Sequence, residues 1–190
     1  MNHSFRTRLG IGAAAVVDDQ DRMVMSPSLG KIATTNVTRP NDTTAYASGD
    51  VQGASTSATA AMTFLSQSSG PLGEPNGGFL VTDLNLRLNL SAVPSGMAGF
   101  RLHLYSSLPA SAYGDNAAWD LPSGDTGYQG YIDIDTPVDM GSTLFAQMKG
   151  INKLVQLDAS GNLYGYLVTL GAYTPTALAT RTIRLFGTAL

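Results

Sequence analysis

The 190-residue sequence contains no cysteine, and this absence excludes several kinds of site. Without thiols the chain has no disulfides, no thiolate metal ligands and no cysteine nucleophile, so its stability must come from packing or from partners. Folding in a reducing cytosol is the simplest expectation. A chain of this length buries roughly 70% of its unfolded surface, which is enough for a full hydrophobic core in one domain.

Charged residues are scarce as well. They account for 13% of the chain, whereas about 25% is usual for globular proteins, and the net charge is −3. The 11 lysines and arginines are scattered singly, so no basic stripe is present that could neutralise several phosphates, and we expect no nucleic-acid partner. No apolar run is long enough to span a bilayer, and the apolar stretch 9–17 is short, interrupted by glycine and followed by aspartates, unlike a typical signal peptide. We therefore expect no membrane partner.

What the sequence has in abundance is short apolar runs separated by Gly, Pro, Asn and Asp, the pattern of a β-sandwich or barrel. In the clearest run, 79–90, leucines alternate with polar residues: Leu84, Leu86, Leu88 and Leu90 with Asp83, Asn85, Arg87 and Asn89. A strand places these leucines on one face, whereas a helix would spread them around its circumference. The full run would be roughly 40 Å long as a single strand, so we expect a bend or bulge near residues 77–78 or Val81.

Further strands are predicted in the same way, and only residues 115–119 suggest a helical turn. The predicted strands are 32–38, 60–66, 100–105, 128–134, 143–148, 153–157, 163–170 and 180–186. The turn residues 158–162, in which Gly161 can adopt a positive φ, predict a hairpin between two antiparallel neighbours. Strand 163–170 is apolar on both faces, which favours a buried central strand over a subunit interface.

These patterns predict an all-β fold, with enough strands for a two-sheet antiparallel β-sandwich, and an extended N-terminal arm. Residues 1–30 show no sustained periodicity and carry an acidic cluster, so we assign 1–30 to an extended arm or a peripheral hairpin and 31–190 to the β-sandwich domain. Because no cysteine is available, the hydrophobic core must hold the sandwich together.

Histidine is too rare for most catalytic arrangements. The two histidines are His3, in the expected arm, and His103, which the alternation in strand 100–105 places on the outward face with Arg101 and Tyr105. Neither histidine lies near a Gly-x-Ser-x-Gly nucleophile elbow. We expect His103 to be a solvated polar residue rather than part of a Ser-His-Asp triad.

Two acidic clusters are candidates for a Ca²⁺ site or for paired catalytic acids. The clusters are Asp133, Asp135 and Asp139, and Asp18, Asp19 and Asp21. The first lacks the glycine and the distal glutamate of an EF-hand loop. Acids at a strand end or in a turn usually form a hydrated edge or a solvated face, and this is our interpretation of both clusters. We therefore assign no catalytic, cofactor-binding or metal-binding residue, and we expect no cofactor and no enzymatic activity.

Aromatic residues make up only 8% of the chain, but tyrosine is concentrated in the C-terminal half together with the single tryptophan. The residues concerned are Tyr105, Tyr113, Trp119, Tyr128, Tyr131, Tyr164, Tyr166 and Tyr173. Tyrosines on strands and loops can form a platform for sugars or a protein interface. Half-buried tyrosine on a sheet is the commonest case, and we expect it here.

Several segments resemble proteins of tailed-bacteriophage virions that are encoded near capsid genes. The resembling segments are 38–51 (Thr-Arg-Pro-Asn-Asp-Thr-Thr-Ala-Tyr-Ala-Ser-Gly-Asp-Val), 100–105, 115–119, 130–132, 163–165 and 173–175. The resemblance covers the chain from about Lys31 onward. It implies a β-sandwich, jelly-roll-like protein of the capsid decoration or cement type, and it carries over no catalytic residue. Within the first segment, Arg39-Pro40 also favours an extended backbone, and residues 46–50 favour a turn.

Together with the low charge, this resemblance predicts a capsid decoration (cement) protein on the capsid exterior of a bacteriophage virion, assembled in the host cytoplasm. Such a protein stabilises the head by binding the major capsid protein, and we expect homo-oligomers, with a trimer favoured over a dimer. The alternative is a receptor-binding or fibre-tip module of the virion that binds host glycans through its tyrosines. A polysaccharide-cleaving enzyme that uses Asp133 or Asp135 is the third and least favoured hypothesis.

Overall fold

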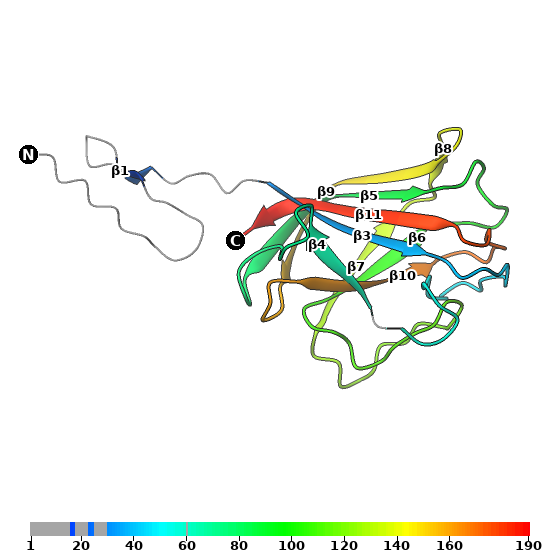
Figure 1. Cartoon of the computed structure of the whole chain (residues 1–190), viewed down its shortest axis with the longest axis horizontal. Coiled ribbons are helices and arrows are strands. Elements are labelled where there is room, and N and C mark those ends of the chain that lie inside the picture. Colours follow the sequence, from blue (N-terminus) through cyan, green and yellow to red (C-terminus); the bar gives the residue numbers. More distant parts are fainter. Residues whose placement is uncertain (1–15, 18–22, 25–29, 60) are drawn as a thin grey trace, which may run out of the picture.

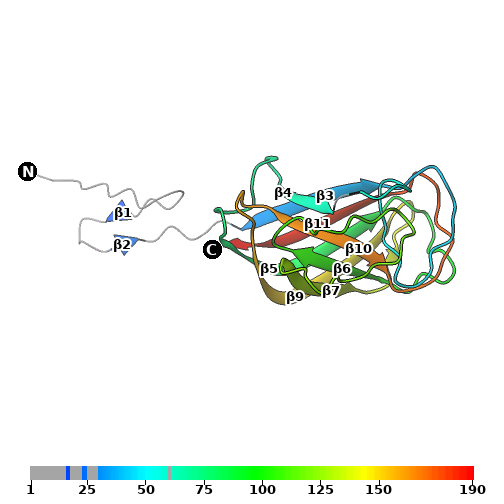
Figure 2. The ribbon, with the colours of Figure 1, turned by 90° about the horizontal axis from the view of Figure 1, so that it is seen from below.

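The computed structural model describes residues 16–17, 23–24, 30–59 and 61–190, and these residues form only strands and loops (Figure 1, Figure 2). The strands are β1 Val16–Val17, β2 Met23–Val24, β3 Lys31–Thr38, β4 Met62–Ser66, β5 Gly78–Leu88, β6 Phe100–Tyr105, β7 Tyr128–Ile134, β8 Val138–Asp139, β9 Leu144–Gln156, β10 Leu163–Thr169 and β11 Thr180–Ala189. No helix in this part of the chain is able to cross a membrane. Of the expected arm, residues 1–30, the described part includes the antiparallel pairing of β1 with β2 and Gly30. His3, Asp18, Asp19 and Asp21 lie outside the described residues.

Strands β3 to β11 form one antiparallel sheet in the order β7-β6-β10-β4-β3-β11-β5-β9-β8. Strand β4 joins the two halves of this sheet, because its residues 62–64 pair with β10 and its residues 65–66 pair with β3. The sheet folds over at β4, so that β7, β6 and β10 lie below β3, β11, β5 and β9 in Figure 1. The backbone N–H of Gln156 on β9 donates to Oε1 of Gln129 on β7 at 3.4 Å and links the two halves again. The predicted all-β antiparallel fold is confirmed. Two separate sheets are not confirmed, and the jelly-roll-like order stays a prediction.

The hydrophobic core lies between the two halves of the sheet. The predicted leucine face of β5 is buried, since Leu84, Leu86 and Leu88 have no exposed surface and Leu90 is 8% exposed. Inward residues of β6 and β10 complete the core from the other half: Phe100, Leu102, Leu104, Leu163 and Leu167. Burying one such side chain contributes roughly 1.5–3 kcal/mol. Alternating apolar residues, without any cross-link, therefore hold the two halves together.

The strands predicted at 143–148 and 153–157 are a single strand, β9. Between them, Gly150 and Asn152 adopt positive φ angles of 67° and 51°, and the pairing with β5 shifts register next to Val81. A bulge of this kind bends a long strand without ending it. The expected bulge near Val81 is therefore confirmed, but the break seen in the sequence around Gly150 belongs to that bulge and not to a loop.

The hairpin predicted at 158–162 is wrong. A turn does form there, because the Asp158 carboxylate accepts hydrogen bonds from the backbone N–H groups of Ser160 and Asn162, and Gly161 has a φ of 76°. However, β9 pairs with β5 and β8, whereas β10 pairs with β4 and β6. The turn therefore carries the chain from one half of the sheet to the other. Turn residues determine the local backbone but not the partner of the strand that follows.

The helical turn predicted at 115–119 is also wrong. This segment contains a non-helical turn, and Ala118 forms an isolated antiparallel bridge with Asp50. The carboxylate of Asp115 points into the protein, where it binds an arginine and a tyrosine from a distant loop. These tertiary contacts override the weak local preference for a helix.

Candidate functional site

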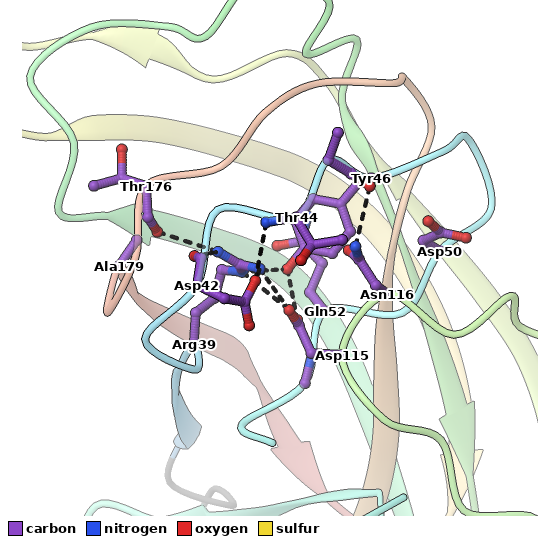
Figure 3. Close-up of polar contacts among 12 residues, drawn as sticks. Arg39, Asp42, Thr44, Tyr46, Asp50, Gln52, Asp115, Asn116, Thr176 and Ala179 are labelled. Atoms are coloured by element: carbon purple, nitrogen blue, oxygen red, sulfur yellow. Dashed lines mark hydrogen bonds and ion pairs between the residues drawn. The ribbon is translucent and has the colours of Figure 1, made fainter. Parts of the chain in front are cut away.

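Three residues from distant parts of the chain meet beyond the end of β3, around a buried arginine (Figure 3). Arg39 directly follows β3, Tyr46 lies in the next loop, and Asp115 lies in the loop between β6 and β7. Arg39 donates from Nη2 to Asp115 Oδ2 and from Nε to the Tyr46 hydroxyl, both at 2.6 Å. The Tyr46 hydroxyl in turn donates to Asp115 Oδ1 at 2.6 Å. The three side chains thus form a closed ring of hydrogen bonds.

Backbone groups from two loops complete this cluster. Arg39 Nη1 donates to the carbonyl oxygens of Asp42 and Thr176 at 3.0 and 3.3 Å. Asp115 Oδ1 also accepts the backbone N–H of Gly53 at 2.8 Å. The Arg39 cluster therefore ties together the loop after β3, the loop before β7 and the loop before β11.

Both charges of the Arg39 cluster are removed from water. The side chains of Arg39 and Asp115 are 0% and 1% exposed. Burial alone lowers the pKa of Arg39, but the hydrogen bond and the ion pair with Asp115 raise it overall, so the guanidinium stays charged. Burial raises the pKa of Tyr46, which stays protonated. Because desolvation opposes the attraction, such a pair adds little net stability, and its main effect here is to fix the arrangement of the three loops.

A second buried arginine, Arg181 of β11, has no carboxylate within 4.0 Å among the described residues. It is 1% exposed and donates only long hydrogen bonds, of 3.5 Å each, to the Tyr173 hydroxyl and the Ala179 carbonyl. Gln52, which is 2% exposed, donates to the same hydroxyl at 2.7 Å. In the described part of the chain, Gln52 Oε1 and Arg181 Nε have no hydrogen-bond partner. Each unpaired buried polar atom costs about 1–3 kcal/mol, so the two unpaired atoms of Gln52 and Arg181 lower the stability of the folded protein.

The sequence analysis predicted neither buried arginine. A signal existed for Arg181, because it shares a strand face with Ile183 and Leu185, and that face is apolar. No comparable signal existed for Arg39, whose burial depends on Asp115 in a loop far along the chain.

The outer face of β6 and β10 carries a second hydrophobic layer. Its buried residues are Val51, Ala61, Tyr105, Tyr164, Tyr166 and Val168. Tyr113 and Trp119, from the loop 106–127, pack against these residues and cover them. Because the main core covers the other face, all seven residues of β10 are buried. The prediction of a central strand covered on both faces is confirmed.

The prediction that His103 is solvated is wrong. The residue faces outward from β6, but it is only 3% exposed because Trp119 stacks on it, with ring centroids 3.6 Å apart. Its Nδ1 forms a hydrogen bond with the Tyr128 hydroxyl at 2.9 Å. Burial, with a smaller effect of the Arg101 charge, lowers the pKa of His103 to about 4, so the ring is neutral at pH 7. Tyr105, on the same face, is fully buried and accepts a hydrogen bond from Trp119 Nε1 at 3.2 Å.

The acidic residues of the segment 133–139 do not converge. Asp133 of β7 forms a bidentate ion pair with Arg101, with Nε–Oδ1 and Nη2–Oδ2 distances of 2.6 and 3.0 Å. Asp139 belongs to β8, and β7 and β8 are the two edge strands of the sheet. Among the described residues, no group of three or more His, Asp or Glu side chains could hold a metal ion. Asp133 and Asp139 therefore lie on the two opposite edges of the sheet, and Asp135 is exposed in the loop between β7 and β8.

The eight tyrosines do not form an exposed platform. All eight lie in the described part of the chain. Tyr131 is 47% exposed, and the other seven are buried or half-buried. The Arg101 guanidinium covers the Tyr131 ring, with its Cζ 3.9 Å from the ring centroid. On the exposed surface, only this partly covered tyrosine ring is available for stacking on sugars, as predicted for the alternative function.

A cavity of about 230 Å³ opens where β3 and β4 separate. The two strands pair only between 33–34 and 65–66, and beyond that point β4 pairs with β10. The cavity is lined by uncharged residues: Thr35, Asn36, Val37, Val51, Gln52, Gly53, Ala54, Thr59, Met62, Thr63, Tyr113 and Tyr166. Hydroxyl and amide groups beside two tyrosine rings suit a small, uncharged, polar ligand.

The outer face of β3, β11, β5 and β9 differs from the face that the loop 106–127 covers. Side chains from all four strands are exposed on it: Asn36, Arg87, Gln147, Lys149 and Arg184. Both buried hydrophobic clusters in the described residues lie elsewhere, one between the halves of the sheet and one over β6 and β10. This open sheet face therefore presents exposed side chains from four adjacent strands to a partner.

No family model matches the chain, and no curated protein matches it. Among solved structures, one similar chain comes from the native virion of Kashmir bee virus at acidic pH, with 13% identity, 97% of this chain and 81% of the other covered, and a TM-score of 0.28. Another comes from a marine algae virus of the order Picornavirales. It has 11% identity and a TM-score of 0.29, and the match covers 100% of this chain and 85% of the other. The K3 cleaved adhesin domain of Lys-gingipain from Porphyromonas gingivalis w83 has 12% identity and a TM-score of 0.26, and the match covers 67% of this chain and 63% of the other. TM-scores this low do not establish a common fold, and the relation to tailed-phage virion proteins stays a prediction.

Proposed function

We propose that this chain is a virion structural protein, a capsid decoration (cement) protein on the exterior of a bacteriophage head that stabilises the head by binding the major capsid protein. The observation that carries this proposal is the difference between the two outer faces of the folded sheet. The chain's own loop 106–127 covers β6 and β10, whereas the open sheet face of β3, β11, β5 and β9 has exposed side chains on every strand. The sequence resemblance to tailed-phage virion proteins supports the same function.

The proposed mechanism is the burial of protein surface against the shell. A stable contact buries at least about 1,200 Å² in total, and repetition over a closed shell adds avidity to modest individual affinities. We propose a homo-oligomer, with a trimer favoured over a dimer, because several contacts per assembly strengthen attachment. Assembly in the host cytoplasm agrees with a chain that has no cysteine. In this proposal the chain uses no cofactor, binds neither nucleic acid nor membrane, and performs no catalysis.

Copy counting on purified particles tests this function. Quantitative mass spectrometry should find the chain in hundreds of copies per particle, since a decoration protein repeats over the shell. Particles that lack the chain should release their genome at a lower temperature, and addition of the purified protein should restore the wild-type temperature. Tens of copies or fewer, or no gain in thermal stability, would contradict the proposal.

The cavity between β3 and β4 favours a second candidate function, a receptor-binding or fibre-tip module that binds host glycans. Its volume of about 230 Å³ and its uncharged lining suit a single sugar ring. A glycan array followed by titration of the selected sugar would test this. Tyr113→Ala and Thr63→Ala, both in the lining, should weaken binding at least tenfold, while Gln147→Ala on the open sheet face should not. The absence of any glycan signal rejects this candidate.

A further inference from the structure

The open sheet face carries cations that form no ion pair within 4.0 Å in the described part of the chain. Arg184 lies on β11, where it pairs in register with Thr34 of β3 and Asn85 of β5. Arg87 and Lys149 lie on the same outer side of β5 and β9, since their neighbours in sequence face the core. All three side chains are exposed. Arg184, Arg87 and Lys149 therefore form a basic triplet that spans three adjacent strands.

This positive charge is local. In the described structure, strands β3, β11, β5 and β9 contain the carboxylate of Asp83 and no other, although the whole chain has a net charge of −3. None of the ion pairs found among the described residues involves the basic triplet. By contrast, the half-buried Arg101 of β6 is neutralised by Asp133. Asp83 pairs in register with Lys149, so Arg184 and Arg87 supply the excess positive charge that this face can offer to an external partner.

Apolar side chains accompany the basic triplet. Ile32 of β3, Leu80 of β5, Phe145 of β9 and Phe186 of β11 are half-buried, and three of these residues alternate with core residues on their strands. Phe186 pairs in register with Ile32 on one side and with Asp83 on the other. Arginine together with aromatic and aliphatic side chains is the composition enriched in protein interfaces. The open sheet face therefore has the residue composition that is typical of a protein interface.

We propose that the open sheet face is the surface that docks on the shell, and that its basic triplet binds an acidic patch of the major capsid protein. This inference rests on the proposed function and adds to it an orientation: the loop 106–127, on the opposite side of the folded sheet, faces away from the shell. Basic and acidic surfaces attract at long range, so charge pairing raises the rate of docking and fixes the register of the contact.

The size of the surface agrees with this role. Four strands about 4.8 Å apart and eight residues of about 3.3 Å each give roughly 500 Å² on this side, or about 1,000 Å² for both partners. This area lies at the lower limit of specific interfaces, where a single copy binds reversibly and several linked copies bind firmly. The charge pairing supplies the specificity that a small contact area needs.

Add-back to particles that lack the chain tests the inference. Binding of purified wild-type chain should weaken as salt rises, because salt screens exposed charges. At low salt, Arg184→Glu and Arg87→Glu should each raise the Kd at least tenfold. Lys153→Glu is the matched control, since it changes the net charge equally but lies in the gap between β9 and β7, with its Nζ directed at Gly130. This control should stay within twofold of wild type.

Each outcome of this experiment has a separate meaning. If wild-type chain does not bind the particles, the proposed function fails. If it binds and Arg184→Glu and Arg87→Glu bind equally well, the orientation and the acidic patch are wrong, while the decoration role survives. If Lys153→Glu weakens binding as much as the triplet variants, general charge and not the open sheet face is responsible, and the inference is overturned. Unfolding midpoints of all variants confirm that each one is folded.

Discussion

Arg39 and Asp115 are separated by 76 positions in the sequence, yet their side chains meet at 2.6 Å in the interior. Tyr46 joins the same pair and also forms an isolated bridge with Tyr173. The Arg39 cluster thus brings together three of the segments that carry the resemblance to phage virion proteins: 38–51, 115–119 and 173–175. Their residues have an architectural role here, because they hold the loops at one end of the folded sheet.

Removal of the Asp115 charge should destabilise the protein strongly. In Asp115→Asn the Arg39 guanidinium loses its buried carboxylate and keeps only the partly exposed Asp42 carboxylate, 3.2 Å from Nη2. Removing one partner of a buried pair typically costs about 3–5 kcal/mol, and we expect a value near the lower end because Asp42 remains. We expect the midpoint of urea unfolding to fall accordingly at pH 7. The matched control is Asp120→Asn in the same loop, because its residue is exposed and its side chain forms no ion pair with any described residue. Equal midpoints for the two variants would show that the buried pair is dispensable.

Stability should fall as the pH drops from about 6.5 to about 4, in part because of His103. The folded protein lowers the pKa of this residue from 6.5 to about 4, so between these values the unfolded chain binds a proton that the folded chain does not. Protonation therefore favours unfolding, by up to about 3 kcal/mol once the pH reaches the folded pKa. Urea unfolding at a series of pH values measures this slope. In His103→Gln the slope over this range should be flatter than in wild type, and identical slopes would contradict the prediction.

Strand faces could be predicted from the sequence because they depend on neighbours two positions away. The alternation in 79–90 and in 100–105 predicted correctly which side chains face the core. The partner of a strand depends instead on residues far along the chain. The residues at 158–162 are typical of a hairpin turn. However, β10 is apolar on both faces and pairs between β6 and β4, where both of its faces can be covered.

The candidate site was harder to predict than the fold. His103 and Tyr105 occupy outward positions, and only the loop 106–127, which has no periodicity, makes them buried. The burial of Arg39 likewise depends on a carboxylate in that loop. Patterns within one strand contain no information on whether a distant loop folds over it, so the sequence predicted a solvated His103 and a half-buried Tyr105, and it predicted nothing about the burial of Arg39.

Substitutions of three glycines by alanine should separate backbone strain from steric overlap. Gly96 has a φ of 87°, and a Cβ there would overlap the carbonyl oxygen of Ala172. Gly141 has a φ of 97° with open space around it, and Gly124 has neither constraint. A left-handed conformation costs an alanine about 1–2 kcal/mol, and the overlap at Gly96 adds to this. We expect unfolding midpoints in the order Gly124→Ala, Gly141→Ala and Gly96→Ala, from wild-type-like to lowest. A Gly96→Ala variant as stable as Gly141→Ala would show that no close contact exists.

The stacking of Trp119 on His103 should be what keeps the histidine neutral. Trp119→Ala removes the ring that covers His103, so water can reach the imidazole and its pKa should rise from about 4 toward the usual 6.5. Trp119→Phe retains an aromatic cover but loses the hydrogen bond from Nε1 to Tyr105, and the pKa of His103 should stay low in this control. The pH dependence of the imidazole NMR signals measures both values, and a His3→Gln background leaves His103 as the only histidine. A low pKa in Trp119→Ala would mean that the sheet alone desolvates His103, whereas a raised pKa in Trp119→Phe would assign the effect to the hydrogen bond.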